Sequence, residues 1–188
     1  MHRAELFPEV ANFLLRLKQR KDEVFIVSHK TEFGHYDPEK ISLRLEAIRW
    51  MDTQRFFDED GLGLKREHVF FVNNRKEKIE KIIELCCEVF VDDLWEVLSE
   101  PTFPEITRKV LFGKVEENKI VPDLCSTSWR EISRFLLGPE KEEEIQYWIE
   151  NLVGSPVERL SKVEGRANSQ VYGFEKDKQA YAIKWYPD

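Results

Sequence analysis

The sequence predicts an α/β fold in which a parallel sheet is followed by a short antiparallel meander. Two observations favour this class. Up to about residue 138, short apolar runs rich in β-branched and aromatic residues alternate with amphipathic helical patterns. From about residue 157 the apolar period changes from 3.6 to 2 residues, which is typical of antiparallel hairpins.

The helices and strands of the first part are expected in a regular order. Val10, Phe13, Leu14 and Leu17 recur at helical spacing and predict an amphipathic helix. Further helices are expected at 41–57, from Asn74 with Ile79, Ile82, Ile83 and Cys86 on its apolar face, from about Leu94, and from Ser128 to Gly138. Buried strands are expected at 23–27, 68–72, 88–91 and 109–112. Strands that alternate with helices in this way form right-handed crossovers and one parallel sheet covered on both faces.

The last part of the chain has its own pattern. A charged stretch, Glu140 to Glu144, leads into a helix with Ile145, Trp148, Ile149 and Leu152 on one face. The segment from Val157 to Lys184 then alternates in short runs that Gly165 and Gly173 are expected to break. We therefore expect two domains, residues 1–138 and 144–188.

Composition and charge exclude several classes of function. The net charge of −7 and the interleaving of basic with acidic residues argue against a nucleic-acid-binding surface. No apolar run approaches the roughly 18 residues of a membrane span, and no apolar stretch follows Met1 as in a signal peptide. Three cysteines, two of them adjacent, make a poor disulfide framework, and we expect buried free thiols in a reducing cytoplasm. The oligomeric state stays open.

Polar side chains follow three of the predicted strands. Ser28 follows the first strand, Lys78 lies in the first turn of the helix after the second, and Asp92 and Asp93 end the third. Ligands of such sheets bind beyond the carboxyl ends of the strands. A hydroxyl and an ammonium group suit a phosphate, and two carboxylates suit Mg²⁺. Each has a simpler interpretation, as a turn cap, a surface lysine or a helix cap.

These stretches resemble the haloacid dehalogenase-like superfamily, over roughly residues 4–138. The matching segments are Val24–Thr31, Asn74–Lys78 and Phe90–Leu94, which look like its second, third and fourth motifs. The resemblance implies a Rossmann-like three-layer sandwich, a phosphorylated small molecule as ligand and Mg²⁺ as cofactor. It also implies that Ser28 and Lys78 are the catalytic phosphate-binding groups and that Asp92 and Asp93 hold the metal.

The first motif of that superfamily, an Asp-x-Asp after a strand, is expected before residue 5, where only Met1 to Ala4 stand. The segment Asp58–Gly61 mimics the motif, but it follows a helical stretch and comes after the second motif. We therefore expect the aspartate nucleophile and the central strand to be missing, which leaves unpaired strand edges. His29 and His35 are expected at the polar rim.

A second group of residues resembles the start of the aminoglycoside phosphotransferase family, whose fold is kinase-like. The matching residues are Asn168–Tyr172, within an expected polar loop at Glu164–Phe174, and Ala182-Ile183-Lys184 about ten residues later. The resemblance covers residues 144–188 and implies that Ser169 covers the phosphates of ATP and that Lys184 pairs with them. An exposed hairpin with a terminal lysine is the simpler interpretation.

Three functions are compatible with these patterns. The first is a fragment of a phosphatase-like and phosphotransferase-like fusion with Mg²⁺-dependent phosphoryl transfer, from which these 188 residues retain little or no activity. The alternative is a regulatory module that binds phosphate or a partner without turnover. A weaker third possibility is hydrolysis that uses Asp60.

Overall fold

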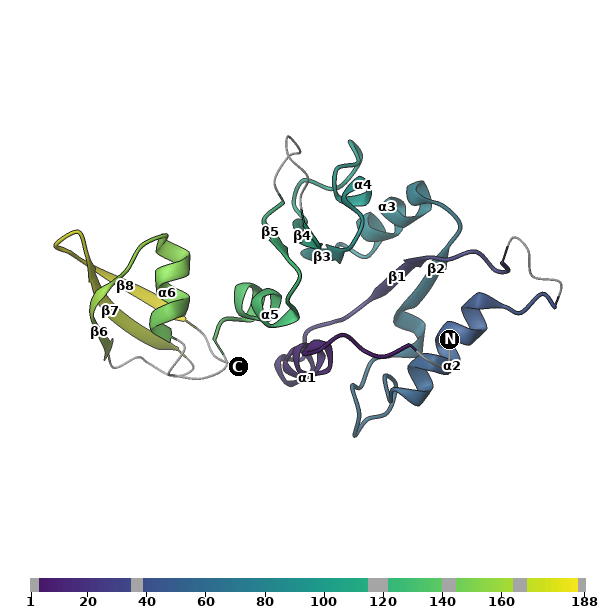
Figure 1. Ribbon diagram of the computed structural model, residues 1–188, viewed down its shortest axis with the longest axis horizontal. Helices are drawn as coiled ribbons and strands as arrows, with labels where there is room; N and C mark the ends of the chain where they lie inside the picture. Colours follow the sequence, from purple (N-terminus) through teal and green to yellow (C-terminus); the bar gives the residue numbers. More distant parts are fainter. Residues whose placement is uncertain (1–3, 35–38, 115–121, 140–144, 164–168, 186–188) are drawn as a thin grey trace. The chain divides into compact units, whose positions relative to one another are not determined.

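The computed structural model describes residues 4–34, 39–114, 122–139, 145–163 and 169–185. The chain folds as two compact units, residues 1–129 and 130–188 (Figure 1). The predicted class is confirmed in its coarse form, because parallel strands occupy the first unit and a separate antiparallel sheet occupies the second. Within the described ranges, none of the helices combines the length and apolar character that a bilayer span requires.

The strands of the first unit form two parallel sheets. In one, β1 (Ile26–His29) pairs with β2 (Val69–Val72). In the other, β4 (Arg108–Phe112) lies between β3 (Val89–Asp92) and β5 (Leu124–Ser126). The sequence predicted one sheet. The described residues form two, because none of their strands pairs with the second edge of β1 or of β3.

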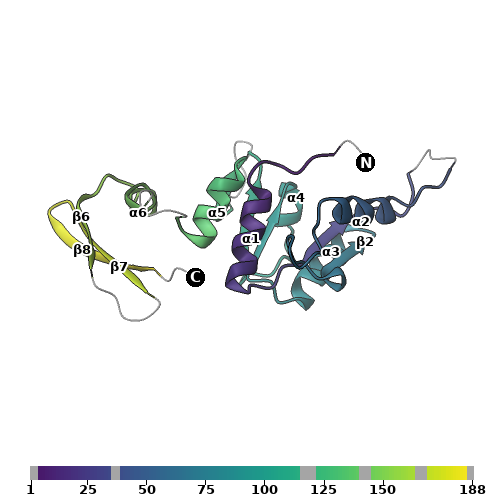
Figure 2. The same ribbon diagram turned by 90° about the horizontal axis from the view of Figure 1, so that it is seen from below.

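Helices cover both faces of these strands, as Figures 1 and 2 show from two directions. One pair is α1 (Val10–Arg20) and α2 (Leu43–Thr53), which enclose an apolar cluster with β1 and β2. The other pair is α3 (Arg75–Glu84) and α4 (Trp95–Leu98), which pack against β3 and β4. A single 3-10 turn, η1 (Arg66–His68), leads into β2.

The buried face of α3 differs from the predicted apolar face. The residues that it buries are Lys78, Ile79 and Ile82, whereas Ile83 is 49% exposed and Cys86 is exposed. The helix ends at Glu84, and Cys86 has a positive φ of 51°, so the chain has left the helical path before it reaches this thiol. The expectation of a buried Cys86 is therefore wrong, and a lysine occupies the inner face of the helix.

The second unit holds α6 (Ile145–Val153) and three antiparallel strands in the order β6 (Glu158–Val163), β7 (Gln170–Lys176) and β8 (Gln179–Trp185). The boundary between the two units falls after the first residue of helix α5 (Trp129–Leu137). A small apolar core joins α6 to the sheet, and its buried members are Ile145, Ile149, Val157, Tyr172 and Phe174.

The predicted break at Gly173 is wrong. Gly173 lies inside β7, opposite Ala182 of β8, and the chain turns at Asp177 and Lys178 instead. Both turn residues have positive φ values, 51° and 63°, as two-residue hairpin turns of the primed type require. The other predicted break, Gly165, lies outside the described residues.

Candidate functional site

The first turn of α3 is held by a reciprocal cap between Asn74 and Glu77. The Glu77 amide donates to Asn74 Oδ1 at 2.9 Å, and Asn74 Nδ2 donates to Glu77 Oε1 at 2.7 Å. Glu77 Oε2 also accepts from the amide of Asn73 at 2.8 Å. These hydrogen bonds, with the Asn73 amide foremost, lower the pKa of Glu77. The cap fixes the helix at the residue before Lys78.

Lys78 and Asp92 form a buried ion pair at the end of β3. Lys78 Nζ lies 2.5 Å from Asp92 Oδ2, and the two side chains are 10% and 3% exposed. Asp92 is the last residue of β3, and its Oδ1 accepts from the amide of Leu94 at 2.9 Å. Lys78 Nζ also lies 5.5 Å from the centroid of the Phe90 ring. The fold therefore brings together two residues that are 14 positions apart and that the sequence predicted to share a site.

Ser28 and Asp93 are placed near strand ends but are not joined to this pair. Ser28 is half-buried in β1, in register with Phe71 of β2, and α3 packs against β1. In the described part of the chain, no hydrogen bond links Ser28 to Lys78 or Asp92. Asp93 is exposed. Their roles stay predictions.

The fit of the site to Mg²⁺ is incomplete. Magnesium prefers six oxygen ligands in octahedral geometry. Both carboxylate oxygens of Asp92 already accept hydrogen bonds. No group of three His, Cys, Asp or Glu residues suited to a metal ion occurs among the described residues. His29 is exposed, and His35 lies outside the described residues. The predicted metal site needs oxygen ligands beyond Asp92 and Asp93.

Arg44 connects the loops that follow β1 and β2, and the sequence did not single it out. Its Nε donates to the carbonyl oxygen of Lys30 at 2.9 Å, and its Nη2 donates to Asn73 Oδ1 at 2.7 Å. The side chain is 22% exposed and lies 3.6 Å from a carboxylate oxygen of Glu32. One feature of the sequence could have identified Arg44: a cation in the first turn of a helix opposes the helix dipole and therefore needs a compensating contact.

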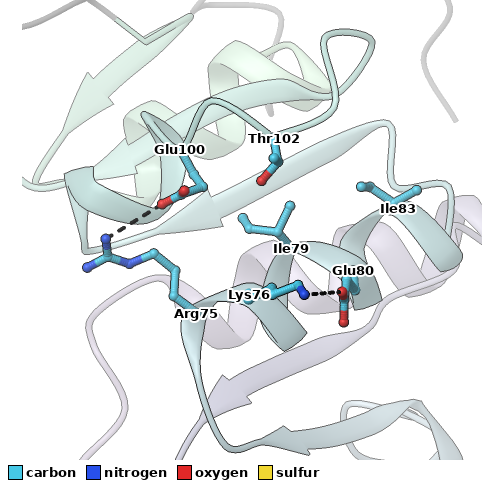
Figure 3. A pocket seen from close by; sticks show the side chains of 7 residues that line it. All are labelled: Arg75, Lys76, Ile79, Glu80, Ile83, Glu100 and Thr102. Carbon is cyan, nitrogen blue, oxygen red and sulfur yellow. Dashed lines mark ion pairs between the residues drawn. The ribbon is translucent and has the colours of Figure 1, made fainter.

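Figure 3 shows an open hollow of about 520 Å³ on another side of α3. Its lining residues are Arg75, Lys76, Ile79, Glu80, Ile83, Glu100 and Thr102. Arg75 lies 3.6 Å from Glu100, and Lys76 lies 3.8 Å from Glu80. Both of these cations therefore face a carboxylate. Neither Lys78 nor Asp92 lines the hollow.

Asp60 is placed differently from the strand-end residues. It lies in the turn after α2, its side chain is 82% exposed, and its carboxylate lies 2.5 Å from Arg55. The hydrogen bond from Arg55 lowers the pKa of Asp60. The structure therefore pairs this carboxylate with an arginine in an exposed turn, and its use as a nucleophile stays a prediction.

The predicted nucleotide-binding residues lie on two adjacent strands of the second unit. Ser169 is buried directly before β7. Lys184 is exposed on β8, in register with Val171 of β7. Residues 164–168 of the predicted loop lie outside the described residues, whereas Gln170–Phe174, also predicted as loop, lie in strand β7 because they pair with β6 and β8. Ser169 is therefore two residues before Val171, which pairs with Lys184 across β7 and β8.

Comparison with protein-family models, with curated proteins and with solved structures found no match for this chain.

Proposed function

We propose that the first unit is a phosphate-binding domain of the haloacid dehalogenase-like kind, which takes a phosphorylated small molecule at the rim that carries Lys78. The observation that supports it best is the contact between Lys78 and Asp92. An ammonium group and a carboxylate that are both withdrawn from water are costly unless they are paired. This pair stands at the carboxyl end of a parallel strand, where ligands of such sheets bind.

Each strand-end residue has a distinct part in this proposal. The ammonium group of Lys78 attracts the phosphate, the hydroxyl of Ser28 donates to a phosphoryl oxygen, and the carboxylate of Asp92 holds Lys78 in place. Mg²⁺, if held by Asp92 and Asp93 together with further oxygen ligands, would neutralise phosphate charge. Full phosphoryl transfer also needs a carboxylate nucleophile. We propose that a further strand, paired with the edges of β1 and β3 that no described strand occupies, supplies this carboxylate.

The second unit is proposed as the first part of a kinase-like lobe that binds ATP. Its three antiparallel strands run β6, β7, β8, and Lys184 stands in β8. This order of strands is compatible with a phosphate-covering hairpin followed by a strand lysine. Ser169, which is buried directly before β7, would then contact the phosphates. Together the two units form part of an enzyme that handles phosphate groups.

A non-catalytic module is the second candidate, and the metal site favours it. Among the described residues, no group of three His, Cys, Asp or Glu side chains is arranged to hold a metal ion, and Asp92 is paired with Lys78. A pocket with a cation and a hydroxyl but no nucleophile would bind a phosphorylated ligand or a partner without turnover. Hydrolysis of a generic phosphate ester with Mg²⁺ separates the two candidates. The first predicts hydrolysis once a strand that carries the carboxylate nucleophile is present, and the second predicts none.

The proposal is tested by titrating the protein with inorganic phosphate, with and without Mg²⁺, while its amide resonances are recorded. We expect saturable shifts at Ser28 and in the first turn of α3, and their loss in Ser28→Ala and Lys78→Met. Lys81→Met is the matched control, since Lys81 lies on the same helix and pairs with Glu84 instead. Absence of saturable shifts in the wild-type protein would refute phosphate binding at this rim.

A further inference from the structure

We infer that Arg44 is a positioning residue for the proposed phosphate site, because it holds the segment that carries Ser28 against the segment that carries Lys78. The inference rests on the proposed function and adds to it a residue from a helix that the strand-end motifs do not include. Arg44 is the second residue of α2, after the N-cap Ser42. It acts through the backbone and through Asn73, and not by contact with the ligand.

The first half of the argument is the connection to Ser28. Arg44 Nε donates to the carbonyl oxygen of Lys30, which is two residues after Ser28. Two further contacts tie the same loop to the start of α2: the amide of Leu43 donates to the carbonyl oxygen of Glu32 at 2.8 Å, and Ser42 Oγ donates to Glu32 Oε1 at 2.6 Å. The chain that leaves β1 is therefore anchored on the first turn of α2.

The second half is the connection to Lys78. Arg44 Nη2 donates to Asn73 Oδ1, and the amide of Asn73 donates to Glu77, the neighbour of Lys78 in α3. Asn73 follows the last residue of β2. One planar guanidinium thus reaches the loop after β1 and the loop after β2 at the same time. Lysine cannot reproduce this bridge, because its single nitrogen cannot donate in two fixed directions from a planar fork.

The placement of the charge supports a role beyond local stability. A cation in the first turn of a helix is disfavoured by the helix dipole. The Arg44 side chain is also largely removed from water, at 22% exposure. Both effects oppose an arginine at this position. The two hydrogen bonds to the loops and the nearby Glu32 carboxylate offset them, and they do so at the rim where the ligand is proposed to bind.

The test combines a ligand-free measurement with phosphate binding. Arg44→Gln and Arg44→Lys are compared with Arg49→Gln, a change of an arginine on the same helix that is 73% exposed and paired with Glu46. In amide hydrogen exchange, we expect the Arg44 variants to speed exchange at Lys30 and Asn73 together. The amide of Leu64, which donates to Phe56, should be unaffected.

In phosphate titrations, Arg44→Gln should raise the dissociation constant by about tenfold, Arg44→Lys should rescue it only in part, and Arg49→Gln should leave it unchanged. Asn73→Ala should add little to Arg44→Gln, because the two residues act through one hydrogen bond. A wild-type dissociation constant in folded Arg44→Gln, or unchanged exchange at both loops, would overturn the inference. If the wild-type protein binds no phosphate, the proposed function fails, and a positioning role for Arg44 fails with it, even where exchange shows that the bridge exists.

Discussion

Replacing Lys78 by methionine removes one partner of the buried ion pair and leaves the Asp92 carboxylate without its counter-charge. The Asp92 side chain is 3% exposed, so water cannot take the place of the lysine without local opening. Loss of one partner from such a pair costs about 3–5 kcal/mol of unfolding free energy. Because about 1.4 kcal/mol corresponds to a factor of ten, the unfolding equilibrium of the first unit should shift by between about a hundredfold and a few thousandfold.

The double variant Lys78→Met/Asp92→Leu tests whether this cost comes from the unpaired charge. With both charges removed, most of the loss should be recovered, apart from about 1 kcal/mol for the Leu94 amide, which loses its acceptor. The control is Glu84→Gln, which breaks the exposed pair with Lys81 and should change stability by less than about 0.5 kcal/mol.

Hydrogen exchange of the amides in β3 and β4 is the appropriate assay, because it follows the first unit separately from the second. A loss below about 1 kcal/mol in Lys78→Met would refute the reasoning. So would a double variant that is as unstable as the single one, since the buried charge would then not be the cause.

Three further results are expected. The lowered pKa of Glu77 means that its cap stabilises α3 at neutral pH and weakens as the pH falls below about 4.5, and Glu77→Gln should remove this part of the acid dependence in exchange measurements on α3. Gly173→Ala should be neutral or stabilise the fold by up to about 1 kcal/mol, because an added Cβ meets its nearest neighbour at 3.5 Å. Gly63→Ala should destabilise the fold, because φ is +70° at that position. Urea unfolding of the two variants measures both changes. Iodoacetamide should modify exposed Cys86 before Cys87, whose pKa is raised by burial, and peptide mass mapping at short times would contradict this if Cys87 reacted first.

Long, periodic features of this chain were predictable because they depend on neighbours in sequence. The strand patterns at 68–72 and 109–112 match β2 and β4 to within a residue, and the cap formed by Asn74 and Glu77 follows from a spacing of three residues. In the same way, the alternation of strands and helices predicted parallel pairing, which the structure shows.

Features that depend on where a helix or strand ends were harder to predict from the sequence. A helical projection placed Cys86 with Ile79 and Ile82, but the helix stops at Glu84 and the thiol turns outward. Gly173 was taken as a break because glycine is frequent in turns, yet the cross-strand neighbours of β7 leave it room inside the sheet.

By itself, the sequence determined that Ser28, Lys78 and Asp92 stand at or shortly after the carboxyl ends of strands in a parallel α/β unit, since strand length and apolar period are local properties. Only the tertiary structure decided that Lys78 pairs with Asp92 and that Arg44 joins two loops, because these contacts depend on how α2 and α3 pack beside the strands. The pairing of Lys78 with Asp92 comes from folding, which withdraws both charges from water side by side, and no local pattern of the sequence contains that information.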